Sequence, residues 1–132
     1  MKIVLDTNIL ASGIFWDGTP LKVIDLWEKE KLQALASDWI LDEYLRTIHR
    51  IAKKIERLDL YRTWALTLPS KIEFVSVKKS FKLCRDPMDD MFIDCAIAGN
   101  ARFIVSGDRD LLVLGQVLNV QIINPRQLLQ EF

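Results

Sequence analysis

The sequence predicts an α/β fold, a three-layer α/β/α sandwich around a central parallel sheet of about five strands. Short apolar runs alternate with longer segments of helical periodicity, which is the pattern of βαβ units. Two of these runs, Lys2–Leu5 and Phe103–Val105, break abruptly into small polar residues, as buried parallel strands do at their carboxyl ends. The 132 residues are expected to form one domain with a real hydrophobic core.

The elements are predicted in the following order along the chain. Strands are expected at Lys2–Leu5, Leu32–Ala36, Ile72–Val77, Phe103–Val105 and Val120–Ile123. Helices are expected at Ile9–Phe15, Leu21–Glu30, Asp38–Lys54, Leu58–Leu68, Met88–Ala98 and Gln127–Phe132. Pro20 suits the first turn of the second helix, and Pro69 is expected to follow the end of the fourth. The segment 78–86 is polar and basic.

Composition restricts the classes of function. Eighteen acidic and eighteen basic residues cancel, so any contact with nucleic acid must come from a local patch. Cys84 and Cys95 have no C-x-x-C spacing, so we expect two reduced thiols and no zinc site. No apolar run could span a membrane, and Met1-Lys2 leads directly into a strand rather than a signal peptide. We therefore expect a cytoplasmic protein with no membrane partner.

Carboxylates follow two of the predicted strands. Asp6 comes directly after the first strand, and Asp108 and Asp110 come after the strand Phe103–Val105. Each acid alone is typical of a helix or turn cap. Their recurrence at corresponding strand ends favours a site, because open parallel sheets bind ligands just beyond these ends.

The predicted helix at Met88–Ala98 is apolar nearly all round but is interrupted by Asp90 and Asp94. These acids lie at i and i+4 on one stripe, where like charges repel unless a cation lies nearby. In the alternative, Asp86 caps the helix, Asp89 and Asp90 favour its dipole, and Asp94 faces solvent.

Two acids flank the apolar arc of the predicted helix Asp38–Lys54. Asp42 and Glu43 fall on opposite flanks, and periodicity alone leaves open which of them meets the carboxyl edge of the sheet. The Glu43 flank also carries Trp39, Arg50 and Lys54, and its basic side chains could hold a phosphodiester backbone.

Acids without a histidine cluster suit hard cations such as Mg²⁺ or Mn²⁺. The only histidine, His49, has no evident Ser or Cys partner for a nucleophilic triad. The chain also lacks a Walker loop and a G-x-G-x-x-G motif. These absences favour metal-assisted chemistry over nucleophilic or nucleotide-dependent chemistry.

Taken together, these motifs resemble the PIN domain family, most closely the branch of toxin components of type II toxin–antitoxin systems. The motifs are Leu5-Asp6-Thr7-Asn8, Ser37 with Ile40-Leu41-x-Glu43, Arg85-Asp86-Pro87-x-Asp89-Asp90, Ile104-Val105-Ser106-Gly107-Asp108-Arg109-Asp110-Leu111-Leu112, and Ile123-x-Pro125. Each motif is short, but their order and spacing are specific and span essentially the whole chain.

The resemblance implies a metal-dependent endoribonuclease similar to VapC. By match to the family pattern, the acidic quartet would be Asp6, Glu43, Asp90 and Asp108, of which Asp6, Asp90 and Asp108 would hold Mg²⁺ or Mn²⁺. Asp89 could take the place of Asp90. Asn8 and Ser106 would orient carboxylates, and Asp110 would be an auxiliary acid.

RNA would be the substrate, and its phosphates would meet basic residues near the acids. The candidates for these contacts are Arg50, Lys54, Lys78, Lys79, Lys82 and Arg85. The resemblance also implies a small antitoxin and a second copy of the chain as partners.

Two other functions agree with part of the pattern. A PIN-fold module could serve only as a binding surface, but such a scaffold has no physical need for four converging carboxylates. An Asp-based phosphotransfer domain also places an Asp at a strand end. Against it, Asn8 stands where a D-x-D motif has its second Asp, and no strand ends in the lysine of a receiver domain.

Overall fold

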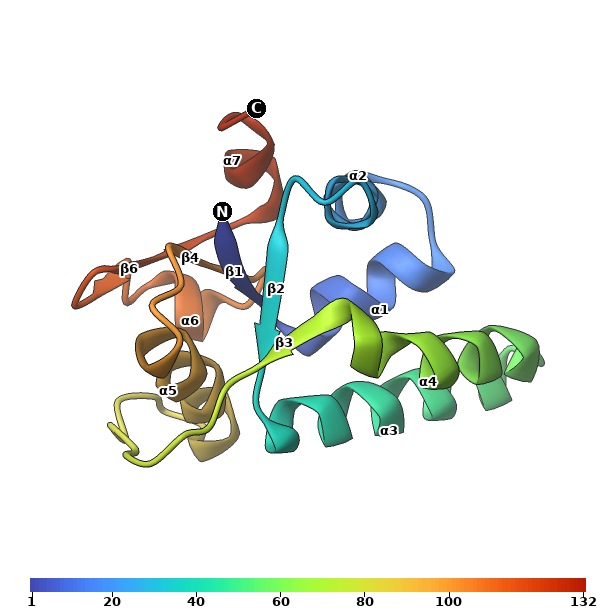
Figure 1. Cartoon of the computed structure of the whole chain (residues 1–132), viewed down its shortest axis with the longest axis horizontal. Coiled ribbons are helices and arrows are strands. Elements are labelled where there is room, and N and C mark those ends of the chain that lie inside the picture. The colour runs from blue at the N-terminus through green and yellow to red at the C-terminus, as the bar shows by residue number, and fades with distance from the viewer.

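The computed structural model describes residues 1–132, and a six-stranded sheet in the order β3-β2-β1-β4-β6-β5 lies at its centre (Figure 1). The strands are β1 (Lys2–Leu5), β2 (Gln33–Ala36), β3 (Ile72–Phe74), β4 (Phe103–Val105), β5 (Gln116–Val117) and β6 (Val120–Ile123). Neighbouring strands from β3 to β6 pair in parallel, and only β5 is antiparallel, to β6. The prediction of a mostly parallel α/β sheet is confirmed.

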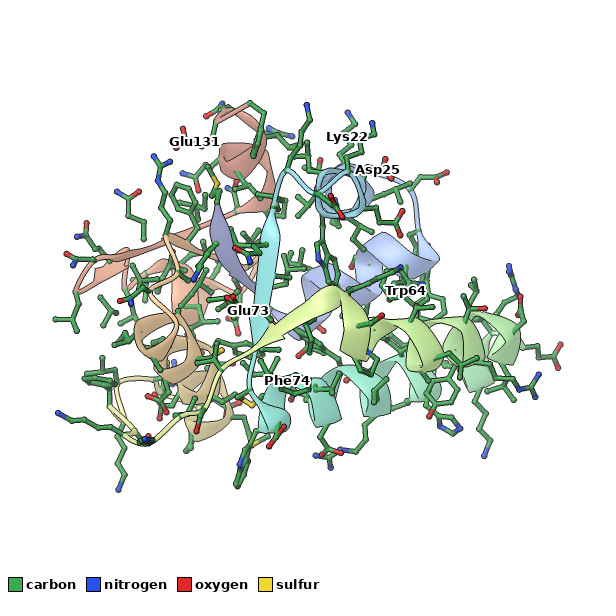
Figure 2. All side chains as sticks on the ribbon, viewed as in Figure 1. Lys22, Asp25, Trp64, Glu73, Phe74 and Glu131 are labelled. Carbon is green, nitrogen blue, oxygen red and sulfur yellow. The ribbon has the colours of Figure 1, made fainter.

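The edge strand β5 is absent from the sequence prediction. It has only two residues, too few to show an alternating pattern, and it returns to β6 through Leu118, whose φ is +52°. At the opposite edge β3 ends at Phe74, three residues earlier than expected. Phe74 and Glu73 are labelled in Figure 2, and the exposed Phe74 side chain marks this open edge.

The helices are α1 (Thr7–Phe15), α2 (Thr19–Glu28), α3 (Asp38–Lys54), α4 (Leu58–Lys71), α5 (Asp90–Ala98), α6 (Arg109–Leu112) and α7 (Pro125–Leu129). A 3₁₀ turn at Pro87–Asp89 leads into α5. The short helix α6 is absent from the sequence prediction. Pro69 lies inside α4, which continues to Lys71, so the prediction that the helix ends before Pro69 is wrong. A proline removes only one backbone donor, and here it lies in the last turn of the helix.

The helices cover both faces of the sheet. Helix α5 packs against β1, β2 and β4, whereas α1 packs against α2 and α3 on the other side (Figure 1). Each strand of the centre is therefore buried on both faces, and Val4, Leu35 and Ile104 are completely inaccessible to solvent. None of the helices combines the length with the apolar character that a membrane crossing requires.

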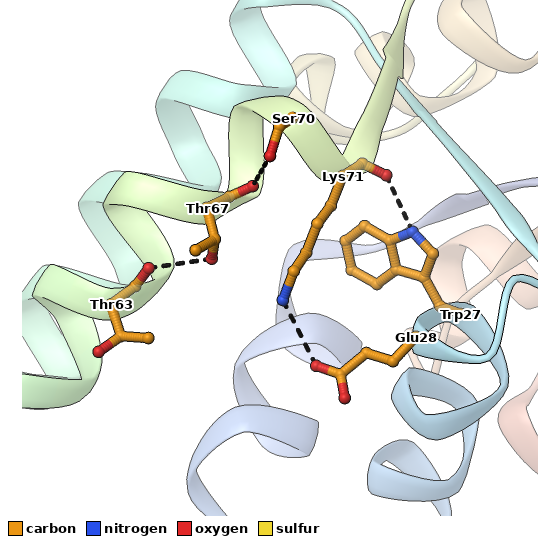
Figure 3. A network of polar contacts seen from close by, with 6 residues as sticks. All are labelled: Trp27, Glu28, Thr63, Thr67, Ser70 and Lys71. Atoms are coloured by element: carbon orange, nitrogen blue, oxygen red, sulfur yellow. Dashed lines mark hydrogen bonds and ion pairs between the residues drawn. The ribbon is translucent and has the colours of Figure 1, made fainter.

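Helix α2 is joined to the end of α4 by a network around Lys71 (Figure 3). The indole N–H of Trp27 donates to the Lys71 carbonyl at 3.0 Å, and Lys71 Nζ lies 3.4 Å from Glu28. The same ammonium lies 4.4 Å from the centre of the Trp64 ring. A cavity of about 810 Å³ adjoins this network at the amino edge of the sheet, away from the acids described below.

Gly13 lets α1 and α2 approach closely, and replacing it tests this packing. A Cβ at position 13 would lie 2.3 Å from Ile24 Cδ1 and 2.9 Å from the Pro20 carbonyl oxygen. Gly13→Ala should therefore lower the free energy of unfolding by about 1–3 kcal/mol in urea denaturation, despite the better helix propensity of alanine. Ser12→Ala, on the same helix and half-buried, is the control and should change stability by less than about 0.5 kcal/mol. A stabilised Gly13→Ala variant would contradict this account of the packing.

Candidate active site

Strands β1 and β4 bring two distant segments together at the carboxyl edge of the sheet. Leu5 pairs with Val105, so Asp6 and Ser106 follow side by side. The Ser106 hydroxyl donates to Asp6 Oδ2 at 2.6 Å and accepts the backbone N–H of Asp108 at 3.0 Å. Ser106 thus connects the first strand-end acid to the loop that carries the second.

Asp6 and Asp108 are both helix N-caps as well as members of this cluster. Asp6 Oδ1 accepts the backbone N–H of Asn8 at 3.4 Å, and Asp108 Oδ1 accepts that of Asp110 at 2.9 Å. The capping and the site interpretations therefore both describe these acids. Asn8 orients Asp6 through its backbone, while its own side chain is exposed.

The structure places Glu43, and not Asp42, on the flank of α3 that faces the end of β1. The Thr7 hydroxyl donates to the Glu43 carboxylate, whereas Asp42 pairs with Arg46 on the outer surface. Next to Glu43, the buried Tyr44 hydroxyl donates to the carbonyl of Leu5 at 2.5 Å. Sequence reasoning missed Thr7 and Tyr44, although Thr7 belongs to the same polar triplet as Asp6.

Asp89 and Asp90 have different surroundings. Asp90 Oδ1 accepts the backbone N–H groups of Leu83 and Cys84 at 2.8 and 2.7 Å, so this carboxylate holds the preceding segment against α5. The Asp89 carboxyl instead interacts with the strand-end acids: burial raises its pKa to about 6, with help from the negative charges of Asp108, Asp86, Asp6 and Asp110. The sequence favours Asp90 as the ligand, and this arrangement favours Asp89.

The acids at the sheet edge have no cationic partner. Burial raises the pKa of Asp6, and the charges of Asp108 and Glu43 raise it further against the lowering effect of the Ser106 hydrogen bond. None of the ion pairs in the structure involves Asp6, Glu43, Asp89 or Asp108. The cluster is therefore electrostatically strained in the protein alone.

The chemistry of this donor set fits a hard divalent cation. Every donor is a carboxylate or hydroxyl oxygen, the ligand type that Mg²⁺ and Mn²⁺ prefer, and a cation would supply the missing positive charge. No three of the His, Cys, Asp and Glu side chains have converged closely enough in the structure to share one ion. The chemistry of these residues therefore suits a divalent cation, and the carboxylates would have to move closer together to bind it.

Comparison with known proteins identifies the family. A family model described as the PIN domain matches residues 2–110, a range that contains all of these acids. The chain belongs to the PIN domain family. An uncharacterised protein of Methanocaldococcus jannaschii is 28% identical, in an alignment covering 100% of this chain and 92% of the relative.

A solved structure shares the PIN fold of this chain. It is a chain of VapBC2 from Rickettsia felis, bound to a DNA fragment from its promoter. It superposes with a TM-score of 0.64 at 18% sequence identity, over 94% of this chain and 98% of that chain.

The six basic residues predicted to contact phosphates are exposed in this PIN domain. Arg50 and Lys54 lie on α3, and the others lie on the segment 75–86 between β3 and the 3₁₀ turn, at Lys78, Lys79, Lys82 and Arg85. None of the six forms an ion pair. All of them therefore remain available to an anionic ligand.

The two neighbouring acids should respond oppositely to neutralisation in EDTA. Because the pKa of Asp89 is raised on folding, its contribution to stability is full below about pH 4 and is lost as pH rises through about 6. Asp89→Asn should therefore melt at or above the wild-type temperature at pH 7, and the difference should shrink towards pH 4. Circular dichroism melts at both pH values measure this.

Asp90→Asn is the matched comparison. It weakens two charge-assisted hydrogen bonds and should lower stability by about 1–2 kcal/mol at pH 7. A destabilised Asp89→Asn variant beside an unaffected Asp90→Asn variant would reverse the assignment of the two residues.

Proposed function

We propose that this PIN domain is a Mg²⁺- or Mn²⁺-dependent endoribonuclease that hydrolyses phosphodiester bonds in RNA. The main support is the cluster of Asp6, Glu43, Asp89 and Asp108, which has no counter-charge at the carboxyl edge of the sheet. PIN domains are typically nucleases and generally use divalent metals, which agrees with a hydrolase.

In this proposal Asp6, Asp89 and Asp108 would hold the cation. Ser106 fixes the rotamer of Asp6 and the backbone of Asp108, so two ligands are oriented by one hydroxyl. Glu43, held by Thr7, accepts a hydrogen bond from the attacking water and directs it towards phosphorus. A divalent ion supplies Lewis-acid activation of the phosphodiester and of water. Asp90 takes a structural role, and Asp110 adds negative charge nearby.

The basic residues would bind the RNA backbone. A chain of zero net charge has no long-range field for RNA, so affinity must come from local contacts. The segment 75–86 and the Glu43 flank of α3 would supply these contacts. Such contacts position an RNA without reading its sequence.

We further propose that the nuclease is the toxin of a toxin–antitoxin pair and works in the cytoplasm. The support is the shared fold with a chain of VapBC2, together with the family motifs. A small antitoxin would then inhibit the enzyme, and two copies of the chain would form a homodimer. Coexpression of the neighbouring open reading frame, followed by size-exclusion chromatography, tests both partners.

Neutralising Asp6 tests the catalytic proposal. Asp6→Asn keeps the size of the side chain and its contact with Ser106 but removes a ligand charge. Cleavage of a labelled unstructured RNA in Mn²⁺ should fall at least about 100-fold, because a key electrostatic group is removed. Asp42→Asn is the control, since Asp42 is exposed and pairs with Arg46. Cleavage that persists in Asp6→Asn or in excess EDTA would contradict the proposal.

The salt dependence of binding tests the role of the basic residues. The Lys78→Ala/Lys79→Ala double variant should bind single-stranded RNA more weakly than wild type, whatever the base sequence of the RNA. The slope of log K against log salt should become shallower by about 0.7 for each phosphate that the variant no longer neutralises. Fluorescence anisotropy in EDTA measures binding without cleavage. An unchanged slope would place the RNA backbone elsewhere on the protein.

A further inference from the structure

A cavity of about 700 Å³ lies beside the acid cluster, between the start of α3, the segment 75–86 and α5. None of Asp6, Glu43, Asp89 and Asp108 lines it. Its volume is in the range of small-ligand pockets. Trp39, Lys82 and Asp94 are among the residues that line it.

Asp94 offers an unused acceptor to this cavity. Its side chain is only 6% exposed, and Oδ1 accepts the backbone N–H of Phe81 at 2.9 Å. The second carboxylate oxygen has no hydrogen-bond partner within the protein, and Asp94 lines the cavity. A carboxylate oxygen can only accept, so it calls for a ligand that carries N–H groups. The negative charges of the buried Asp90 and Asp94 would also repel a phosphate in this cavity.

Trp39 stands at the rim of the same cavity. Its side chain is 76% exposed, so the faces of its indole ring are accessible to a ligand. Trp39 precedes Glu43 by four residues on α3, so both lie on the same side of the helix. Trp39 therefore connects the rim of the cavity to the helix face that carries Glu43. An exposed indole is a stacking platform for the bases of a single strand.

We infer that this cavity binds one base of the RNA substrate, stacked on Trp39 and hydrogen-bonded to Asp94, and that it prefers guanine. The inference rests on the proposed nuclease function and adds its sequence preference. Guanine presents two adjacent donors, N1–H and N2–H₂, to a carboxylate, and Lys82 at the cavity wall would donate to O6 instead of contacting a phosphate. Adenine and cytosine offer one amino group each. Uracil presents its single N–H between two carbonyl oxygens, which a carboxylate repels.

Binding to short RNAs in EDTA tests this preference without cleavage. The probes are labelled uridine octamers with no substitution or with one central guanosine, adenosine or cytidine. Wild-type protein should bind the guanosine octamer about tenfold more tightly than the all-uridine octamer, with the other two between them. Equal affinity for all four probes, a preference for uridine, or tighter binding of free GMP than of the octamer would overturn the inference.

Three variants identify the groups responsible. Asp94→Asn keeps an oxygen for the Phe81 N–H but turns its free oxygen into an amide donor, so the guanosine preference should disappear. Trp39→Ala should weaken every octamer about tenfold, whereas Trp39→Phe should stay within about threefold of wild type. Leu66→Ala, at a side chain 82% exposed on α4, is the control for removal of an exposed apolar residue. If Trp39→Ala does not fold, the loss or survival of the guanosine preference in Asp94→Asn still decides.

Cleavage in Mn²⁺ separates this inference from the nuclease proposal. Cutting beside the guanosine in wild type, and at random positions in Asp94→Asn, supports both. Cleavage with no base preference in either protein overturns the cavity assignment alone. A guanosine preference in binding that Asp94→Asn abolishes, without any cleavage, overturns the nuclease and leaves a base-specific RNA-binding cavity.

Discussion

The parallel pairing of β1 with β4 is the constraint on which the rest of the site depends. This pairing places Asp6 beside Ser106, although 100 residues separate them in the chain, and their 2.6 Å hydrogen bond joins the two strand ends. A helix follows each of these strands within a few residues, and each helix is stabilised by a polar N-cap. Local capping thus puts a carboxylate at each strand end, and the sheet register brings the two together.

The same arrangement imposes a cost on the folded protein. Asp6 is buried without a cation, and its neighbours Glu43 and Asp108 add further negative charge. Such a cluster destabilises the protein alone, which is typical of sites whose groups serve a ligand and not the fold. The apolar core beneath the acids offsets this repulsion, since Val4, Leu5 and Val105 are almost fully buried directly below them. Hydrogen bonds from Ser106 and Thr7 orient the charges without neutralising them.

Much of this fold can be predicted from the sequence because its central strands and helices have clear local patterns of apolar residues. The bounds of β1, β4, β6 and α3 agree with the predicted ranges, since each is a clear apolar run or a long amphipathic repeat. β5 and α6 are too short to carry any period, so tertiary pairing and the Asp108 cap determine them. Whether Glu43 or Asp42 faces the strand ends depends on how α3 is rotated about its axis against the sheet. The contact that shows this orientation joins Glu43 to Thr7, which is 36 residues earlier in the chain.

The sequence alone does not distinguish the roles of Asp89 and Asp90. They are adjacent, but a 3₁₀ turn ends at Asp89 and α5 begins at Asp90, so their side chains project in directions roughly 100° apart. The sequence favours Asp90 because its surroundings are apolar. In the structure that burial arises from the segment 75–86, whose backbone N–H groups donate to Asp90 and Asp94.

An irregular segment has unpaired backbone donors, and buried carboxylates on α5 satisfy them. The acids of α5 therefore hold the segment that carries the basic residues, and Asp89, in the 3₁₀ turn that leads into α5, is close enough to the strand-end acids for their charges to raise its pKa. One short helix thereby fixes the position of the proposed phosphate-binding segment relative to the proposed metal ligands, and this relation depends on three-dimensional packing that no local pattern encodes.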